Sequence, residues 1–476
     1  MIEQFREHNI NYEYMKNTRF LKSSYLNALN ADDANIIIWH SLFGNPKLIN
    51  KNTLFLLNIF NKSKTISSVI KQYDINNKQI FDHLILNYFL IPETFNEREY
   101  LSNILENRAH NALDGSLVNY LELRISETCN FNCIYCIQKN IKRIKLSRYK
   151  VFMDFSVAKK SIDVYIDLLM RHKKDIAEIT FSGGEPTLNW EIILKTVDYA
   201  ENNFGKSINF KFYLNTNFSL IDKERAKIIK DRKIDVFPSI DGLKNQNDKV
   251  RISKDNKSSF ELIMKSIKNL KDVGIKIRGI STTTNENNFF DLDEKFIEWI
   301  YKNKFRMLQI NIDVMNLVYA DIDHVVMHLI ELIKYCKELG IEVSGFWRRP
   351  AENLLNNSII NEDVGFCGAA KGHNLCVDPL GDIYSCGYSN FQIGNIYNFG
   401  KFFNLTNPYY EFILNNTPTF IDYCKGCMLE GSCGGGCIIT REFAKKKKSG
   451  IKKINQMCDF YKAMTKEVLL KSYKHF

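Results

Sequence analysis

The stretch Cys129-Asn-Phe-Asn-Cys133-Ile-Tyr-Cys136 is the most informative motif in this sequence. Its three cysteines fall directly after an apolar run at residues 120–125, which predicts a strand. A structural zinc site closes its shell with four ligands. Three thiolates in one loop instead suit a [4Fe–4S] cluster whose fourth iron holds a small molecule through oxygen and nitrogen. Zinc or free thiols are the alternatives at this point.

Length and composition place the chain among globular proteins of two or three domains. It has 476 residues, 45% of them hydrophobic, and 8 prolines. No run of eighteen apolar residues predicts a membrane span, and the polar N-terminus lacks a signal-peptide pattern. We therefore expect a cytoplasmic protein. Since thiols stay reduced there, 12 cysteines gathered in clusters indicate metal binding rather than disulfides.

The net charge of +11 raises the question of a nucleic-acid partner. The lysines are spread along the chain, with local runs at residues 139–150 and 445–448. No recognition-helix or base-stacking motif accompanies them. The charge therefore predicts a solvated surface with some attraction for an acidic peptide, and no nucleic-acid partner.

Residues 1–95 have the element order of a winged-helix-like unit. Residues 1–33 are polar and uninformative. The pattern then predicts strands at 36–43 and 47–50, helices at 52–60, 66–73 and 78–88, and a strand at 89–92. This order resembles the peptide-recognition elements of ribosomal-peptide maturases, in which a leader peptide adds as a strand to the sheet edge. A plain cap on the next domain is the alternative. Residues 96–118 read as a helical linker.

Residues 119–345 alternate strands and helices, which predicts a parallel sheet with right-handed crossovers. The expected strands are 120–125, 177–181, 208–214, 235–240, 276–281 and 307–313, and the helices are 156–172, 190–202, 223–230, 259–273, 292–302 and 322–339. Six such units suggest an open, partial (β/α)6 version of the TIM-type barrel. Its active site is expected at the carboxyl ends of the strands, where the cysteine loop falls.

The second expected strand ends in Gly183-Gly184-Glu185-Pro186. Adjacent glycines let a backbone pass close to a ligand, and a carboxylate accepts hydrogen bonds from a substrate ammonium. Together with the cysteine loop, this motif resembles the radical S-adenosylmethionine (SAM) enzymes. There the open iron chelates the amino and carboxylate groups of SAM, and the Gly-Gly-Glu-Pro motif contacts the amino group. A turn before a helix is the alternative role.

The same resemblance implies further SAM contacts. Tyr135 matches the position whose ring packs near adenine, Asn217 ends the third strand, and Ser239 corresponds to a ribose- or SAM-contacting position. Relatives often place a His before the Asp and Arg of this region. Here that His is absent, but Arg251 remains a candidate for the SAM carboxylate. Turn or core roles are the alternatives for these four residues.

Residues 346–476 carry a second cysteine pattern. Its spacing resembles the seven-cysteine SPASM domain: Cys367, Gly381 with Cys386, Cys424-x2-Cys427-x5-Cys433-x3-Cys437, and Cys458. The resemblance implies two auxiliary [4Fe–4S] clusters, one held by Cys424, Cys427, Cys433 and Cys458 and the other by Cys367, Cys386 and Cys437. Cys376 either completes the second cluster or packs in the core. Cys336 lies on an apolar helical face and predicts a buried side chain.

The resemblance covers residues 120–458 and implies a reaction course. The cluster on Cys129, Cys133 and Cys136 receives an electron from a donor such as flavodoxin or ferredoxin and passes it to SAM. The resulting 5′-deoxyadenosyl radical takes hydrogen from a peptide held at the barrel mouth, where water must be excluded. The auxiliary clusters then remove an electron from the product radical or coordinate a substrate thiolate. Asp313 and Glu185 are the acidic groups expected nearest this pocket.

The leading hypothesis is a maturase that installs a thioether or carbon–carbon cross-link in a ribosomally made precursor peptide. Oxidation of a sulfatase residue to formylglycine is a second possibility within the same chemistry. Peptide epimerisation is a third, with Cys336 or Cys376 as hydrogen donor. From another class, a zinc-bound peptide-binding module remains open.

Overall fold

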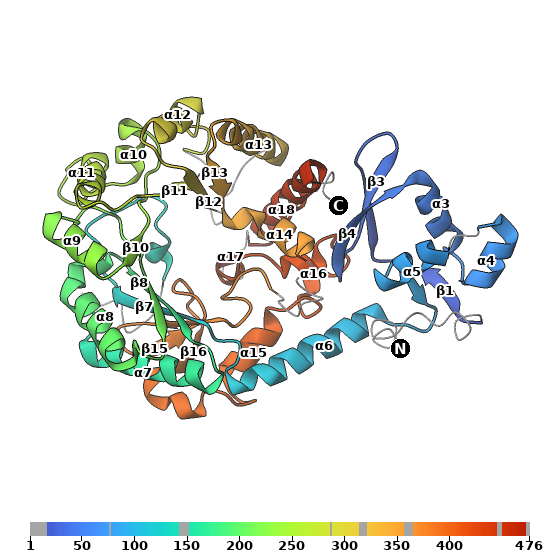
Figure 1. The fold of residues 1–476 in the computed structure, drawn as a ribbon, viewed down its shortest axis with the longest axis horizontal. Coiled ribbons are helices and arrows are strands. Elements are labelled where there is room, and N and C mark those ends of the chain that lie inside the picture. The colour runs from blue at the N-terminus through green and yellow to red at the C-terminus, as the bar shows by residue number, and fades with distance from the viewer. Residues whose placement is uncertain are drawn as a thin grey trace.

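The computed structural model describes residues 17–75, 78–141, 152–285, 288–313, 321–356, 365–444 and 450–472. Figure 1 shows an open ring of strands and helices, with the N-terminal unit at one side of it. Helix α18 (Gly450–Ser472) lies between α13 (Ile322–Glu338) of the ring and the N-terminal unit. None of the helices in these described ranges is long and apolar enough to cross a membrane.

The N-terminal unit consists of two small sheets and three helices. One sheet has the antiparallel order β2-β3-β4, and the other places β1 between β5 and β6. Their bounds are β1 Arg19–Lys22, β2 Leu26–Asn30, β3 Asn35–His40, β4 Gly44–Asn50, α3 Lys51–Ile59, β5 Lys64–Thr65, α4 Ile66–Tyr73, α5 Lys78–Leu86 and β6 Leu90–Pro92. The interpretation of residues 1–33 as uninformative is wrong for β1 and β2. Both are short and half-polar, so neither gives a clear apolar run.

The region expected to be a linker contains a packed helix, α6 (Glu97–Asn111). Asn96 caps its first turn by accepting a hydrogen bond from the Glu99 amide. Leu101 and Leu105 on this helix are fully buried. α6 packs against α15 (Pro408–Asn415) and runs from the N-terminal unit towards the barrel (Figure 1). α6 is therefore a packed helical connection between the N-terminal unit and the barrel.

Six strands followed by helices form the barrel, as the sequence predicts. The strands are β7 Tyr120–Ser126, β8 Ile176–Gly183, β9 Asn209–Leu214, β10 Ile234–Val236, β11 Gly279–Thr284 and β12 Met307–Ile312. The helices are α7 Phe155–Arg171, α8 Trp190–Phe204, α9 Lys223–Asp231, α10 Lys244–Val250, α11 Ser259–Asp272, α12 Glu294–Lys302 and α13. All strand pairings among β7–β12 are parallel.

The fourth and fifth expected strands differ from the observed ones. β10 stops at Val236, and the sheet continues only through a single bridge between Ser239 and Ser281. Pro238 has no amide hydrogen to donate, which interrupts the ladder. β11 begins at Gly279 rather than at residue 276, opposite Met307, where its partner strand β12 starts.

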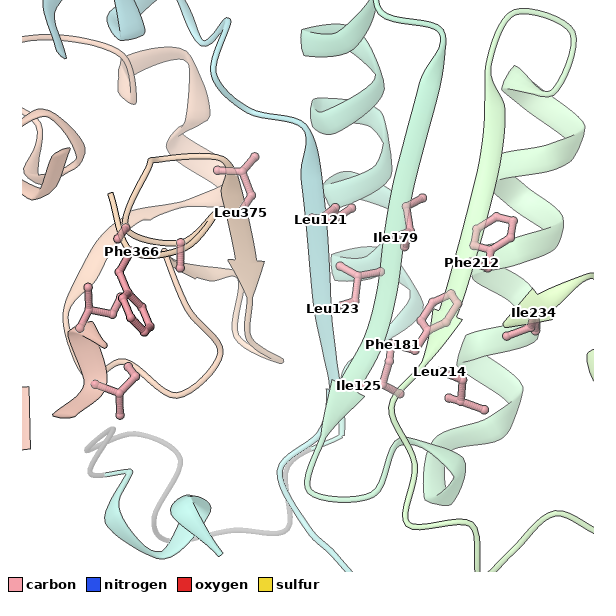
Figure 2. Close-up of a cluster of buried hydrophobic side chains, with 14 of the residues drawn as sticks. Leu121, Leu123, Ile125, Ile179, Phe181, Phe212, Leu214, Ile234, Phe366 and Leu375 are labelled. Atoms are coloured by element: carbon pink, nitrogen blue, oxygen red, sulfur yellow. The ribbon is translucent and has the colours of Figure 1, made fainter. Parts of the chain in front are cut away.

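Side chains alternate between the two faces of the barrel strands. Figure 2 shows apolar residues of β7, β8 and β9 gathered in one buried cluster, including Leu121, Leu123, Ile125, Ile179, Phe181, Phe212 and Leu214. The intervening residues of β7 and β8 are polar and bond to one another across the opposite face. Tyr120 donates to Thr180 (2.6 Å), and Ser182 donates to Glu122 (2.5 Å). The inner wall is therefore hydrogen-bonded rather than apolar.

The C-terminal region continues the barrel sheet. β14 (Asn374–Val377) pairs in parallel with β7, and the hairpin partner β15 (Asp382–Tyr384) is followed by β16 (Gln392–Asn395). The resulting seven-stranded order is β10-β9-β8-β7-β14-β15-β16. Gly381 has φ +85° at the β14–β15 turn, as expected of a glycine-bearing hairpin. The remaining helices are α14 Arg349–Leu355, α16 Glu430–Cys433 and α17 Ile438–Ala444.

The N-terminal unit contacts the cysteine-rich region directly. The Trp39 indole donates to the Met428 carbonyl (2.9 Å), and the Gly431 amide donates to the Ser41 carbonyl (2.8 Å). Arg98 makes two hydrogen bonds to Glu430, of 2.7 and 2.9 Å. Because the Glu430 side chain is fully buried, this ion pair fixes the position of α6 against α16.

Arg98→Ala should weaken this contact by about 3 kcal/mol, since it leaves the buried Glu430 carboxylate without its cation. We expect faster hydrogen exchange across β3, β4 and α6 and a lower unfolding midpoint. Arg19→Ala is the matched control, because the Arg19–Glu93 pair is about half exposed and should contribute less than about 1 kcal/mol. Equal effects of the two substitutions would contradict the prediction.

Candidate active site at the carboxyl ends of the barrel strands

Cys129, Cys133 and Cys136 all lie in the short loop between the end of β7 at Ser126 and the turn that begins at Ile137. Burial raises the pKa of Cys133 to about 11, and the charges of the other two thiols add to the rise. Burial likewise raises the pKa of Cys129, with a contribution from Cys136. The three thiols thus share one loop, and their joint role as ligands of one cluster stays a prediction from the spacing.

Neighbouring segments hold this loop in place. The Phe131 amide donates to the Cys129 sulfur (3.3 Å), and Lys254 donates to the Cys129 carbonyl (2.8 Å). The amides of Asn132 and Ile134 donate to carbonyls at residues 252 and 250. No sequence motif marks residues 250–254 as a support for the loop, so this contact was missed. The contact forms only in the folded chain, where the segment after α10 packs against the cysteine loop.

Gly183 and Gly184 contact the cysteine loop itself. A Cβ on Gly183 would lie 2.0 Å from the Ser126 carbonyl oxygen, and one on Gly184 would lie 2.3 Å from the Thr128 carbonyl oxygen. The Gly184 amide donates to Ser126 (2.6 Å). The sequence predicts that these glycines approach a ligand. In the structure, the absence of a Cβ at both glycines allows the backbones that follow β7 and β8 to pack against each other.

Glu185 is fully buried and joins three strand ends. Its Oε1 accepts from the Thr187 amide (3.0 Å), the Thr187 hydroxyl (2.5 Å) and the Thr216 hydroxyl (2.7 Å). Its Oε2 accepts from the Asn217 amide (2.6 Å). Burial raises the pKa of Glu185, while these bonds act in the opposite direction. The carboxylate is therefore a structural centre as well as a candidate SAM contact.

Asn217 reaches the cysteine loop from the end of β9. Its side-chain amide donates to the Cys129 sulfur (3.7 Å) and to the Asn130 side chain (2.7 Å). It accepts in turn from the Ser219 amide (2.9 Å). Asn217 thus joins the Glu185 carboxylate to a cysteine sulfur through one residue.

Tyr135, Arg251 and Asp241 form a second polar group beside the loop. Arg251 donates to Asp241 (2.8 Å) and lies over the Tyr135 ring at 5.8 Å, and the Tyr135 hydroxyl also donates to Asp241. Burial raises the pKa of Tyr135, and Asp241 adds to the rise. Sequence reasoning singled out Tyr135 and Arg251 but missed Asp241. The Asp in Ser239-Ile-Asp241 was its only signal.

Ser239 and Asp313 both lie where strands of the barrel end. Ser239 pairs with Ser281 in the bridge that continues the sheet. Asp313 follows β12, and its amide donates to the Thr284 carbonyl (2.8 Å). Both positions share the strand-end edge with the cysteine loop, because all these strands are parallel. No described contact joins either side chain to the three cysteines.

The C-terminal cysteines form two further groups. Burial raises the pKa of Cys386 and of Cys437, and Cys367 adds to the rise in both cases. Burial also raises the pKa of Cys433, with contributions from Cys424, Cys458 and Cys427. These influences relate Cys367, Cys386 and Cys437 to one another, and likewise Cys424, Cys427, Cys433 and Cys458, while Cys386 also acts on Cys376. The two sets of cluster ligands that the SPASM resemblance implies stay a prediction.

Three consecutive glycines let one short loop serve both groups. Gly434, Gly435 and Gly436 have φ values of +56°, +76° and +74°. This left-handed region strongly favours glycine. The turn lies between Cys433 of one group and Cys437 of the other. Glycine is therefore favoured at all three positions by the backbone conformation of this turn.

Cys376 and Cys336 occupy different environments. Cys376 on β14 lies opposite Glu122 of β7 and donates its thiol hydrogen to that carboxylate (3.1 Å). Burial raises its pKa, and the charges of Glu122 and Cys386 add to the rise. Cys336 is fully buried in the apolar core, as expected, and burial raises its pKa to about 12. Cys376 is therefore the one of the two that faces the inner wall.

The donor chemistry of the sulfur groups is compatible with iron–sulfur clusters. Within the described residues, no three Cys, His, Asp or Glu side chains are arranged to hold one metal ion. A zinc ion needs four donors drawn tightly around one point. An iron–sulfur cluster spreads its cysteine ligands around a larger core. The chemistry of three sulfur groups, one of them with three thiols in a single loop, fits iron–sulfur clusters.

A family model describing the radical SAM superfamily matches residues 123–300. A radical SAM cyclopropyl synthase, TigE, of Paramaledivibacter caminithermalis is 25% identical over 473 residues, covering 96% of this chain and 97% of that protein. A protein of Methanocaldococcus jannaschii is 31% identical over 272 residues, covering 56% of this chain and 85% of that protein.

Among solved structures, anSMEcpe with bound AdoMet and Cp18Cys peptide superposes with a TM-score of 0.59 at 21% identity. It covers 75% of this chain and 99% of that one. This likeness supports the fold alone, and it agrees with the expected α/β barrel. The matched model includes the cysteine loop, Gly183–Glu185 and Asn217, the residues that the structure brings together at the strand ends. The chain belongs to the radical SAM superfamily and is an enzyme of that superfamily.

Proposed function

We propose that this chain is a maturase of a ribosomally synthesised precursor peptide and forms a carbon–carbon bond or a thioether in it. The observation that carries this proposal is the similarity to TigE along nearly the whole of both chains, N-terminal unit included. TigE is named a cyclopropyl synthase, and closing such a ring forms a carbon–carbon bond. Of the two bond types, the carbon–carbon bond therefore has the stronger support.

Three cofactor sites follow from the sulfur groups. Cys129, Cys133 and Cys136 would hold the SAM-binding [4Fe–4S] cluster. The two auxiliary clusters would be held by Cys424, Cys427, Cys433 and Cys458 and by Cys367, Cys386 and Cys437, with Cys376 as a candidate further ligand of the latter. When bound, the first cluster and SAM supply hydrogen-atom abstraction from the substrate. A cytoplasmic flavodoxin or ferredoxin would supply the electron.

The strand-end residues would orient SAM. Glu185 Oε2 accepts a single described bond and so has acceptor capacity for the SAM ammonium, alongside the backbone of Gly183 and Gly184. Tyr135 would lie near adenine and Ser239 near the ribose. Arg251 would bind the SAM carboxylate while Asp241 fixes its position. Asp313, at the same edge, is the candidate to accept a proton from the substrate.

The N-terminal unit would bind the leader part of the precursor. β2 is the terminal strand of the β2-β3-β4 sheet, whereas β4 at the other edge packs against α14. A cavity of about 210 Å³ lies beside β2, lined by Lys22, Ser23, Ser24, Leu26, Asn27, Ala28, Ile38, Leu54 and Leu57. An extended peptide can pair with a free strand edge while its side chains enter such a cavity. We therefore place the leader along β2.

Anaerobic co-expression with a short peptide encoded beside the gene tests the reaction. We expect the peptide to lose two hydrogens for each modified site, and Cys129→Ala to abolish this loss because it removes a proposed cluster ligand. Intact-mass and fragmentation spectra would locate the new bond. An unchanged mass with one deuterium gained from heavy water would mean epimerisation. SAM cleavage without any peptide change would redirect the search to a sulfatase-type protein, and neither result would support cross-linking.

Gly184→Ala should displace the cysteine loop, because the added Cβ would lie 2.3 Å from the Thr128 carbonyl oxygen. We expect the variant to retain about four fewer iron atoms per chain than the wild type, the content of one [4Fe–4S] cluster. Iron and sulfide analysis after anaerobic purification measures this. Gly400→Ala is the control, since a Cβ there meets nothing within 4 Å. Full iron content in Gly184→Ala would rule out the proposed dependence.

Ala28→Glu should weaken leader binding. Ala28 is exposed on β2 and lines the cavity, so the substitution places a charge where the peptide would lie. We expect a rise in Kd of about tenfold for a labelled leader peptide, equivalent to about 1.4 kcal/mol. Asn30→Glu adds the same charge to the same exposed strand outside the cavity lining and should leave Kd unchanged. If both variants bind like the wild type, the leader lies elsewhere.

A further inference from the structure

Arg124 is a charged side chain that is fully buried on the inner face of β7. Its Nε and Nη2 donate to the two carboxylate oxygens of Glu127, at 2.7 and 2.8 Å. Nη2 also donates to Gln138 (2.9 Å), which in turn donates to the Gly183 carbonyl (2.7 Å). Glu127 and Gln138 lie on either side of the Cys129–Cys136 loop. One end of the guanidinium is therefore tied to the proposed SAM-binding loop.

The other end of Arg124 faces the segment that follows Cys386. The guanidinium carbon lies 5.9 Å from the centre of the Tyr388 ring. A Cβ on Gly387 would lie 3.0 Å from Arg124 Nη1 and 2.3 Å from Glu122 Oε1. The glycine at this position thus lets the segment rest directly on the two charged side chains. Nη1 itself is buried and has no hydrogen-bond partner within the described residues.

Tyr388 follows Cys386 by two residues and is 40% exposed. Cys386 belongs to the C-terminal region, whereas Glu127 and Gln138 flank the cysteine loop after β7. Arg124 contacts the Tyr388 ring and donates to both of these flanking residues. It therefore connects the segment that carries Cys386 to the loop of the first sulfur group.

We propose that Arg124 is a positioning residue that fixes the Cys129–Cys136 loop against the Cys386 segment, and that its charge favours reduction of the clusters at both. The inference rests on the proposed function, since it needs clusters at these cysteines. Adding an electron adds negative charge, and a buried cation stabilises that charge more strongly than an exposed one. The bidentate bond to Glu127 keeps the guanidinium fixed. Its Nη1, which has no hydrogen-bond partner among the described residues, places positive charge beside Gly387 in the segment after Cys386.

The Glu127 carboxylate opposes the effect of Arg124 on the reduction of the clusters. Glu127 lies against Arg124 with a side chain only 9% exposed, so its negative charge is poorly screened. Removing that charge while keeping Arg124 should make reduction easier. Removing the charge of Arg124 should make it harder. The two substitutions therefore have opposite expected signs, which a general loss of structure would not produce.

The test is an EPR-monitored redox titration of the full chain, reconstituted anaerobically with iron and sulfide. Arg124→Gln should lower the midpoint potentials of the clusters at Cys129 and at Cys386, and leave that of the Cys424 group unchanged. Arg124→Lys keeps the positive charge, so both midpoint potentials should stay close to the wild-type values. Glu127→Gln should raise the same two potentials. Arg171→Gln is the control, since the Arg171 side chain is 66% exposed on α7.

Each outcome decides the inference. Unchanged potentials in Arg124→Gln at full iron content would overturn it, as would an equal shift at all three clusters. Should Arg124→Gln fail to bind iron, the sign of the shift in Glu127→Gln decides alone, and a fall or no change would overturn the inference. If the wild-type chain binds no iron–sulfur cluster, the proposed function fails instead. The iron content measured before titration distinguishes the two failures.

Discussion

The site depends on the packing of two backbones, those that leave β7 and β8. The amides of Gly184 and Glu185 donate to the carbonyls of Ser126 and Thr128, at 2.6 and 2.8 Å. This contact is possible only because neither glycine has a side chain. It places the start of the cysteine loop against the end of the neighbouring strand. The contacts of Glu185 and Asn217 continue from this junction.

Glu185 extends the junction to a third strand. A buried carboxylate without partners would be strongly destabilising, so the four hydrogen bonds to Thr187, Thr216 and Asn217 offset its desolvation. Through the Asn217 side chain the same network ends on the Cys129 sulfur. Three loops from three strands are thus fixed before any cofactor binds. Such preorganisation is what a reactive centre needs if its geometry is not to relax during the reaction.

The sequence was sufficient for the order of strands and helices in the barrel, because strand–helix alternation is a local pattern. The division of the cysteines into cluster sites follows from short spacings and stays a prediction. The sequence was insufficient for contacts between distant segments. Lys254 contacts Cys129, Asp241 contacts Tyr135, and Arg124 contacts Tyr388, all partners that are distant in the chain and that no local pattern marks. For Gly183 the motif identified the residue, but the reason lies in Ser126, 57 residues earlier.

The pairing of β14 with β7 has the widest consequence for function. The sequence treats the C-terminal cysteines as a separate region, yet Cys376 stands opposite Glu122 in one continuous sheet. β7 ends three residues before Cys129, and β15 ends two residues before Cys386. The positions of these two cysteines are thus set by one hydrogen-bonded ladder rather than by the docking of one domain on another. Under the proposed function, electrons would pass between clusters at these two cysteines. Because electron exchange depends steeply on distance, a shared sheet would hold that distance more constant than a mobile domain interface.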